Sequence, residues 1–193
     1  MEQPFYDLAL YPDLQDLTRQ YSIIVDELKQ NQTWINWGSD RYDPTGHCKF
    51  LTGSWTVCPI YFGNFDPNMV AIPGMKLTEV RELIASLPTK FPETTKLFQK
   101  IPSLNYCGFS RLHPHSNLAP HKHVNSAALI YHLGLIIPPG HSCGLKVGDQ
   151  THTWTKPGDA VVFDDTLEHS AWNNSDQERI ILYVDFVADK KQD

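Results

Sequence analysis

The spacing of apolar residues changes character near residue 104. Before that point apolar residues recur every three or four positions, which predicts an amphipathic helix over residues 13–30. A second helix is expected over Glu79–Ser86 with Thr78 as its cap, and a third over residues 92–100 with proline in its first turn. Between the first two helices, residues 32–75 are rich in Gly, Pro, Asp, Asn and aromatic residues and predict short strands and loops.

After residue 104 the pattern is typical of strands. The aliphatic run at residues 127–137 is long enough to be a buried strand, and residues 145–154 predict a hairpin that turns at Gly148. Further strands are expected at residues 160–163 and 178–187. Short strands at this spacing favour a sandwich or a barrel, with a jelly roll as the leading candidate. The chain is therefore predicted to be mainly β with N-terminal helices.

We expect residues 1–193 to form a single domain, in which a helical and loop-rich part (1–103) supports a β core (104–187). Hydrophobic residues make up 41% of the chain and charged residues 20%, as is usual for a globular protein. A net charge of −6 without any Lys/Arg-rich run argues against nucleic acid as a partner.

Location and redox state are also constrained by the sequence. No apolar run approaches the roughly 18 residues that a membrane span needs, and the acidic N-terminus does not resemble a signal peptide. The four cysteines are widely spaced and form no CxxC pair, which favours reduced thiols. We therefore expect a cytoplasmic protein without a membrane span.

The stretch HPHSNLAPHKH at residues 113–123 holds four of the nine histidines. His121 and His123 would share one face of a strand, because alternate side chains point the same way. His169 lies 48 residues further along the chain, where a neighbouring strand could bring it to the same metal ion. The HSAWN sequence that it begins has the H-x3-N spacing of the second cupin motif.

Arg179 begins an otherwise apolar strand, where a buried guanidinium would need an anion. Its planar fork suits a carboxylate. Histidine ligands together with an inward arginine are what an iron(II) oxygenase that uses 2-oxoglutarate requires. Asp164 and Asp165 are expected to shape a turn or to orient a neighbouring side chain rather than to bind the metal.

Other conspicuous residues are predicted to have structural roles. His113 and His115 precede a proline in a loop, where we expect them to be exposed or to order that loop. Trp154 and Trp172 are expected to pack in the interior. The aromatic residues of segment 32–75 either pack together or cover the substrate side of the site.

Residues 90–187 resemble the aspartyl/asparaginyl β-hydroxylase family. The resemblance is carried by SRLHP (110–114), YHLGL (131–135), FDDTLEHSAW (163–172) and RIILYVD (179–185). It implies a double-stranded β-helix, which is a jelly-roll variant, with iron held by His121 and His169. It also implies that Arg179 and Ser110 contact the distal carboxylate of 2-oxoglutarate, and that His132 lies near the metal-binding end of this co-substrate.

Two positions depart from the family pattern. Related oxygenases place Asp or Glu two residues after the first histidine and this family places a small residue there, whereas this chain has His123. His123 is then either a third metal ligand, a contact to the substrate, or a side chain turned away from the metal. Hydroxylases of Asp and Asn residues carry arginines where this chain has Ala128 and Ile130, which points to a less acidic substrate.

The resemblance thus predicts a hydroxylase that depends on Fe(II), 2-oxoglutarate and O2 and acts on a C–H bond of an amino acid, a peptide or another small substrate. Two alternatives stay open. One is a cupin-like protein that binds a metal or a small acid without turnover. The other is an iron dioxygenase with three histidine ligands that does not use 2-oxoglutarate.

Overall fold

A computed structural model describes residues 3–31, 33–36, 51–63, 76–123 and 128–187. The helices are η1 (Leu8–Leu10), α1 (Pro12–Arg19), α2 (Tyr21–Gln30), α3 (Leu77–Lys90) and α4 (Pro92–Phe98). The larger sheet contains, in spatial order, β1 (Phe5–Tyr6), β10 (Ala160–Phe163), β7 (Ala128–Ile136), β12 (Arg179–Val187), β5 (Leu104–Leu112), β4 (Trp55–Phe62) and β2 (Ile35–Asn36). The smaller sheet contains β3 (Leu51–Thr52), β6 (Ser116–His121), β11 (His169–Asn173), β8 (Cys143–Val147) and β9 (Gln150–Thr153).

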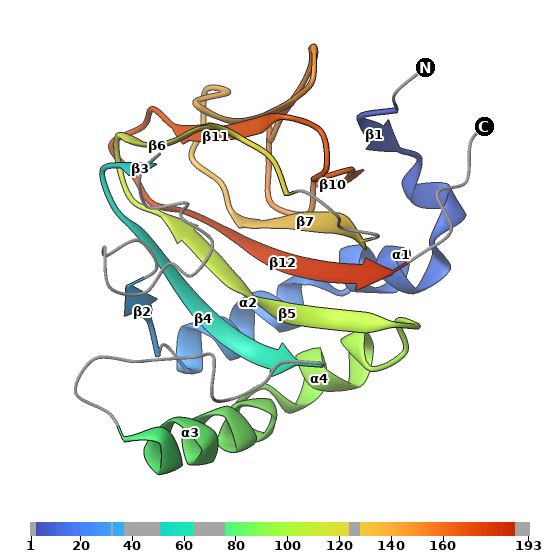
Figure 1. The fold of residues 1–193 in the computed structure, drawn as a ribbon, viewed down its shortest axis with the longest axis vertical. Helices are drawn as coiled ribbons and strands as arrows, with labels where there is room; N and C mark the ends of the chain where they lie inside the picture. The colour runs from blue at the N-terminus through green and yellow to red at the C-terminus, as the bar shows by residue number, and fades with distance from the viewer. Residues whose placement is uncertain (1–2, 32, 37–50, 64–75, 124–127, 188–193) are drawn as a thin grey trace.

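The two sheets face each other, and the helices lie against the outer face of the larger sheet (Figure 1). From β5 onward the chain passes back and forth between the sheets, with β5, β7, β10 and β12 in one and β6, β8, β9 and β11 in the other. All strand pairs are antiparallel. This alternation is that of a jelly roll of the double-stranded β-helix type, and it confirms the predicted fold class.

Side chains along β12 point alternately to the two faces of the larger sheet. Ile180, Leu182 and Val184 belong to the core between this sheet and the helices, together with residues of α1 and α2. The intervening Ile181 belongs to a second core between the two sheets. One strand therefore supplies apolar side chains to the helical layer on one face and faces the space between the sheets on the other.

The helices begin and end at residues other than those expected. The helix predicted over residues 13–30 is divided at Gln20, whose backbone angles (φ −104°, ψ 21°) leave helical geometry. The division lets two short apolar faces, each with two buried residues, follow the twisted sheet. The second helix starts at Leu77 rather than after Thr78, because Glu79 accepts a hydrogen bond from the backbone N–H of Lys76 (2.7 Å).

The segment before residue 104 also contributes strands. β1, β2 and β4 join the larger sheet and β3 joins the smaller one, so the part predicted to support the barrel completes both of its sheets. Short strands were expected within residues 32–75, and β2, β3 and β4 are such strands. Trp37 and Tyr42 of the predicted aromatic segment lie outside the described residues.

Cys58, Cys107 and Cys143 are free and buried, as expected for reduced thiols, and Cys48 lies outside the described residues. Among the helices that the structure describes, none combines the length and the apolar character needed to cross a bilayer. Location in the cytoplasm stays a prediction.

The carboxylate of Glu27 joins two helices of the outer layer. It accepts hydrogen bonds from the backbone N–H groups of Glu93 (2.7 Å) and Thr94 (2.8 Å) and from the Thr94 hydroxyl (2.7 Å). These N–H groups lie in the first turn of α4, where no intrahelical acceptor is available and a negative charge is favourable.

We expect Glu27→Gln to lower the free energy of unfolding by about 1–2 kcal/mol, because three charge-assisted hydrogen bonds become neutral or are lost. Denaturant unfolding followed by circular dichroism measures the change. Asp26→Asn is the matched control, because the Asp26 side chain is 71% exposed and makes only a 3.8 Å ion pair with Lys29 among the ion pairs described. Equal stability of the two variants would contradict the role assigned to Glu27.

Candidate functional site

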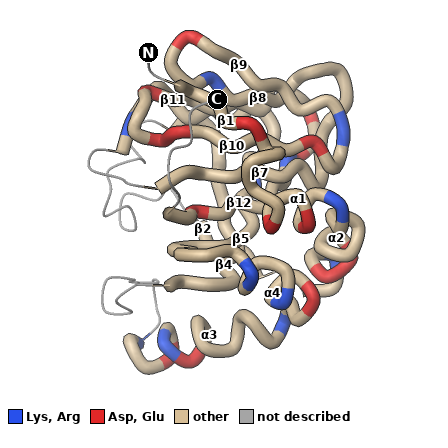
Figure 2. Tube along the Cα trace, turned by 90° about the vertical axis from the view of Figure 1, so that its right-hand side faces the viewer, with Lys and Arg blue, Asp and Glu red and all other residues tan. Residues whose placement is uncertain are grey.

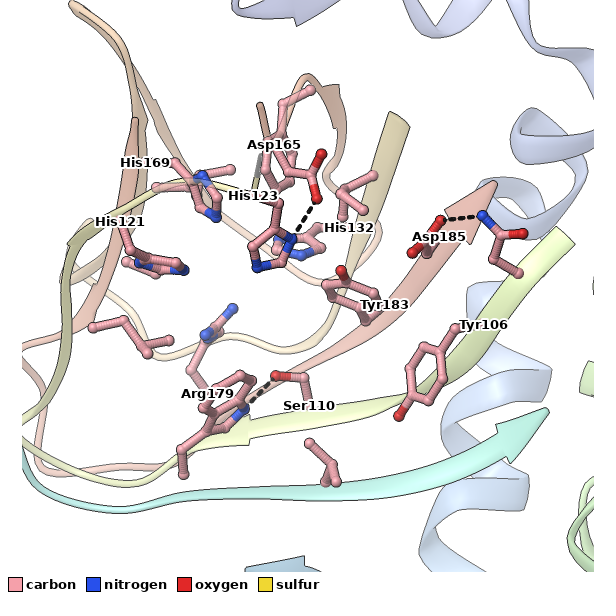
Figure 3. A pocket seen from close by; sticks show the side chains of 18 of the residues that line it. Tyr106, Ser110, His121, His123, His132, Asp165, His169, Arg179, Tyr183 and Asp185 are labelled. Atoms are coloured by element: carbon pink, nitrogen blue, oxygen red, sulfur yellow. Dashed lines mark hydrogen bonds and ion pairs between the residues drawn. The ribbon is translucent and has the colours of Figure 1, made fainter. Parts of the chain in front are cut away.

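A cavity of about 470 Å³ lies between the two sheets and is lined by residues of both. Its walls are mostly apolar, and include Val57, Leu118, Ile130, Leu145, Phe163 and Ala171. Into these walls are set a few polar and charged side chains, which Figure 3 shows facing a common space. An apolar cavity with a small number of convergent polar groups is the usual form of a ligand site.

His121 and His169 lie directly opposite each other on the paired strands β6 and β11. Their ring centroids are 4.3 Å apart. In each ring Nδ1 donates to the carbonyl oxygen of the residue two positions earlier, Ala119 (2.8 Å) or Leu167 (2.9 Å). A carbonyl oxygen only accepts, so the neutral tautomer carries its lone pair on Nε2, the form that binds a metal.

Burial also keeps His169 neutral. The pKa of His169 is lowered to about 4, chiefly by loss of solvent and also by the nearby His121 and His123 rings, although the hydrogen bond to Leu167 acts to raise it. The structure therefore holds a deprotonated imidazole on β11 next to a second imidazole in the same tautomer. Two such nitrogens are a pair that could hold a metal ion.

His123 reaches the same cavity by a route that the sequence did not predict. We expected His121 and His123 to share a face of one strand, but β6 ends at His121. Instead, Asp165 accepts two hydrogen bonds from His123. The Asp165 carbonyl accepts from the His123 backbone N–H (3.0 Å), and its carboxylate accepts from Nδ1 (2.7 Å).

The His123 ring lies further from His121 and His169 than these two rings lie from each other. Its centroid is 6.0 Å from that of His121 and 5.7 Å from that of His169. Within the described residues, no three His, Cys, Asp or Glu side chains are grouped so that they could hold one metal ion. The conformation thus presents a close histidine pair with a third imidazole nearby.

Arg179 is the first residue of β12 and is only 2% exposed, in the wall of the cavity. Among the described residues, its Nε and Nη1 atoms have no hydrogen-bond partner. The guanidinium carbon lies 5.3 Å from the ring centroid of Trp154, a contact that offsets only part of the cost of desolvation. Burial lowers the pKa of Arg179 to about 10, so the side chain remains a cation at neutral pH.

Ser110 and His132 line the cavity on the strands either side of β12. The Ser110 hydroxyl accepts a hydrogen bond from Nε1 of Trp55 (2.9 Å). His132 is 7% exposed, and neither of its ring nitrogens has a hydrogen-bond partner among the described residues. Burial lowers the pKa of His132 well below its ordinary value, and the Arg179 charge lowers it further.

All six side chains singled out from the sequence therefore line one cavity, namely Ser110, His121, His123, His132, His169 and Arg179. Their roles as ligands of a metal or of a co-substrate stay predictions at this point.

Most of the residues predicted to be structural are placed as expected. Asp164 shapes a turn by accepting from the backbone N–H (3.0 Å) and hydroxyl (2.6 Å) of Thr166. His115 is exposed and its Nε2 forms a hydrogen bond with the Asp176 carboxylate (2.8 Å), and His113 contacts the Thr56 hydroxyl (3.3 Å). Trp154 is fully buried as expected, whereas Trp172 is only partly buried.

Four polar residues of the cavity wall were not singled out from the sequence, namely Asn105, Tyr106, Tyr183 and Asp185. Tyr183 and Asp185 lie four and six positions after Arg179 on one strand, so the alternation of β12 could have identified them. Asn105 depends on an irregularity of strand pairing that has no clear sequence pattern.

A jelly-roll barrel with a histidine pair and a buried arginine around an internal cavity is a cupin-like architecture. The family model described as aspartyl/asparaginyl beta-hydroxylase matches residues 18–189, and the chain belongs to this family.

Among curated proteins, the ornithine lipid ester-linked acyl 2-hydroxylase of Rhizobium tropici is 41% identical over 97 residues, which are 50% of this chain and 34% of the relative. The aspartyl/asparaginyl beta-hydroxylase of Homo sapiens is 33% identical over 99 residues, which are 49% of this chain and 13% of the relative. The chain thus matches about a third or less of the length of these relatives.

A solved cupin 2 conserved barrel domain protein from Rhodopseudomonas palustris is a distant structural neighbour, with 11% identity and a TM-score of 0.44 over 82% of this chain and 74% of that chain.

The unpartnered charge of Arg179 gives a test on stability. We expect Arg179→Met to raise the free energy of unfolding by about 1–2 kcal/mol in the absence of an anionic ligand, because methionine fills apolar volume without burying a charge. Denaturant unfolding in a buffer free of carboxylates measures the change.

Arg111→Met is the matched control and should lower stability. Arg111 is paired with Glu178 (3.3 Å), donates to the Thr56 hydroxyl (2.9 Å) and lies 4.0 Å from the ring centroid of Trp34. If Arg179→Met lowered stability as much as Arg111→Met, Arg179 would already have an anionic partner in the folded protein.

Proposed function

We propose that this protein is a hydroxylase that uses iron(II), 2-oxoglutarate and O2 to hydroxylate a C–H bond of an organic substrate. The observation that carries this proposal is the buried Arg179 in the wall of the cavity that holds the histidine pair, because its cationic side chain has donor atoms without a partner among the described residues. A buried cation of this kind needs an anion, and a carboxylate matches the guanidinium fork.

The residues present fit an iron(II) ion. Imidazole nitrogen is a suitable donor for iron, and His121 and His169 face each other in the required tautomer. Backbone carbonyl groups fix both rings, which is how proteins commonly orient histidine ligands. When bound, the iron ion supplies the chemistry that activates O2 at the expense of 2-oxoglutarate.

The residues of this chain supply binding, orientation and exclusion of water. Arg179 binds the distal carboxylate of 2-oxoglutarate, with Ser110 on the neighbouring strand beside it. His132 lines the same cavity and is close enough to Arg179 and to His169 for both to lower its pKa. It is therefore placed to contact the other end of the same molecule as a neutral ring.

The apolar walls keep bulk water away from the reacting groups and strengthen the charge interactions inside. Holding substrate and co-substrate in one enclosed space replaces a collision of separate molecules with a fixed geometry. Acid–base catalysis by a side chain is not required by this scheme.

Only one of the two alternatives differs from the proposal at Arg179. An iron dioxygenase that does not use 2-oxoglutarate has no need of a buried cation at this position. A binding protein without turnover would explain the arginine, but the family to which the chain belongs is described as a hydroxylase family. The relatives named above are likewise described as hydroxylases, one of a lipid and one of aspartyl and asparaginyl groups.

The direct test measures 2-oxoglutarate binding and succinate formation. We expect the protein with iron(II) and ascorbate to release succinate from 2-oxoglutarate, and calorimetry under anaerobic conditions to detect 2-oxoglutarate binding. In the Arg179→Met variant the affinity should fall about a hundredfold, because the charge partner of a buried carboxylate is lost. Arg111→Met, whose cation lies on the other face of β5, should retain it. No binding by the parent protein, together with an indistinguishable Arg179→Met variant, would refute the proposal.

The histidines are tested separately by metal affinity. We expect His121→Ala and His169→Ala each to weaken binding of Co(II), used as a spectroscopic probe for iron(II), more than a hundredfold, since each removes one of two fixed donors. His123→Ala should weaken it less than tenfold, because Asp165 holds that ring further away. His115→Ala, at an exposed position, is the control. An equal loss for His121→Ala, His123→Ala and His169→Ala would establish a site with three histidine ligands.

A further inference from the structure

The cavity has opposite charges at its two ends. Arg179 is the single Lys or Arg among the described residues that line it, whereas Asp165 and Asp185 both line it as carboxylates. Asp185 and Arg179 lie on the same face of β12, six residues apart, which corresponds to roughly 20 Å along the strand. Figure 3 shows Arg179 and Asp185 on opposite sides of the space, with Tyr183 between them.

Asp185 lies beyond Tyr183 on the side of the cavity away from Arg179 (Figure 3). The charges that act on Asp185 are those of Asp165 and His123, while Arg179 and His169 act on His132. A 2-oxoglutarate molecule anchored at Arg179 would therefore leave the end near Asp185 to the substrate. This step rests on the function proposed above.

A β-bulge shapes the acidic end. The pairing of β12 with β5 shifts between Asp185, opposite Tyr106, and Phe186, opposite Leu104, which leaves Asn105 as the extra residue. Asn105 and Tyr106 consequently both line the cavity although they are neighbours in the chain. Nδ2 of Asn105 donates to Oδ1 of Asp185 (2.9 Å), and the other carboxylate oxygen is directed toward the cavity (Figure 3).

The surroundings of Asp185 suit an organic cation. Tyr106 stands between Phe62 and Tyr183, with ring centroids at 5.1 and 5.6 Å, and all three rings line the cavity. Aromatic rings beside a carboxylate favour an ammonium or guanidinium group over a hydrated metal ion. Asp165 is 2% exposed, and its Oδ1 has no hydrogen-bond partner among the described residues, so a second acceptor in the same wall also lacks a donor.

We propose that Asp185 is a specificity-determining residue that binds a cationic amino group of the substrate at the end of the cavity opposite Arg179. The hydroxylated substrate thus belongs to the class of alkylammonium compounds, and Asn105 positions the carboxylate that recognises it. A carboxylate or a neutral analogue of the same length is discriminated against, because it would leave Asp185 desolvated without a counter-charge.

The test uses the full chain and simple probes. Binding of n-butylammonium, n-butanol and n-butyrate is measured by NMR titration for the parent protein and for Asp185→Asn, which keeps the shape and the oxygen that accepts from Asn105. We expect the parent to bind n-butylammonium about tenfold more tightly than n-butanol, and Asp185→Asn to lose this preference. Asp176→Asn, at a carboxylate that is 95% exposed, should keep it.

Three results would overturn the proposal. The first is equal affinity of the parent for the ammonium and neutral probes, and the second is an unchanged preference in Asp185→Asn. The third is a weakening of 2-oxoglutarate binding in Asp185→Asn as large as the weakening of n-butylammonium binding, which would mean that Asp185 acts on the whole cavity. Unfolding midpoints show whether Asp185→Asn is folded. We expect no loss of stability at neutral pH, since burial raises the pKa of Asp185 and makes its charged form costly.

Further arms distinguish the source of the ammonium group. The same titration is made with a short lysine peptide and its Nε-acetylated form, and with phosphatidylcholine vesicles that contain or lack phosphatidylethanolamine. A preference for the ammonium form in any pair, lost in Asp185→Asn, supports the proposal and identifies the source. Probe binding at Asp185 without any 2-oxoglutarate binding would refute the proposed function alone, and 2-oxoglutarate turnover without probe preference would refute this inference alone.

Discussion

The pairing of β12 with β5 on one side and β7 on the other is the constraint on which the cavity depends. Because side chains alternate along a strand, this one register sends Ile180, Leu182 and Val184 to the helical layer and Arg179 to the space between the sheets. A slip of one residue would bury the arginine under the helices and open the apolar residues to the cavity. The apolar packing that stabilises the barrel therefore also fixes the charge in its interior.

The helical layer and the smaller sheet contribute to the same arrangement in different ways. Helices α1, α2 and α4 cover the outer face of the larger sheet, so the apolar half of β12 has a core to join. The smaller sheet supplies both close histidines, since β6 and β11 bring His121 and His169 opposite each other. Figure 2 shows charged residues on loops and helices around the molecule, in contrast to the apolar interior where Arg179 lies. Within the part of the chain that the structure describes, the buried Arg179 has no anionic partner, which is a costly exception to the usual burial of apolar residues.

The sequence predicted the features that depend on periodicity and missed those that depend on irregular backbone. The strands at residues 127–137, 145–154, 160–163 and 178–187 follow from runs of apolar residues and a glycine turn, and all are present. His121, His123, His169 and Arg179 were found because histidine and arginine in apolar strands need a reason to be there, whereas Ser110 and His132 were implied by the resemblance to the family. His123 does line the cavity, but the predicted reason was wrong. The end of β6 and a hydrogen bond to Asp165, rather than strand alternation, bring its side chain there.

Irregular pairing has a second consequence for the cavity. A regular ladder would turn Asn105 and Tyr106 to opposite faces of β5, and only one of them could reach the space near Asp185. The bulge breaks this rule at one residue, which lets an amide hold the carboxylate while a phenol ring forms the adjacent wall. Nothing in a single sequence marks such a position, since Asn is compatible with a strand end, a turn or a bulge. The chemistry at the Arg179 end thus follows from residue type and periodicity, whereas the chemistry at the Asp185 end follows from a local departure from periodicity that only the three-dimensional structure reveals.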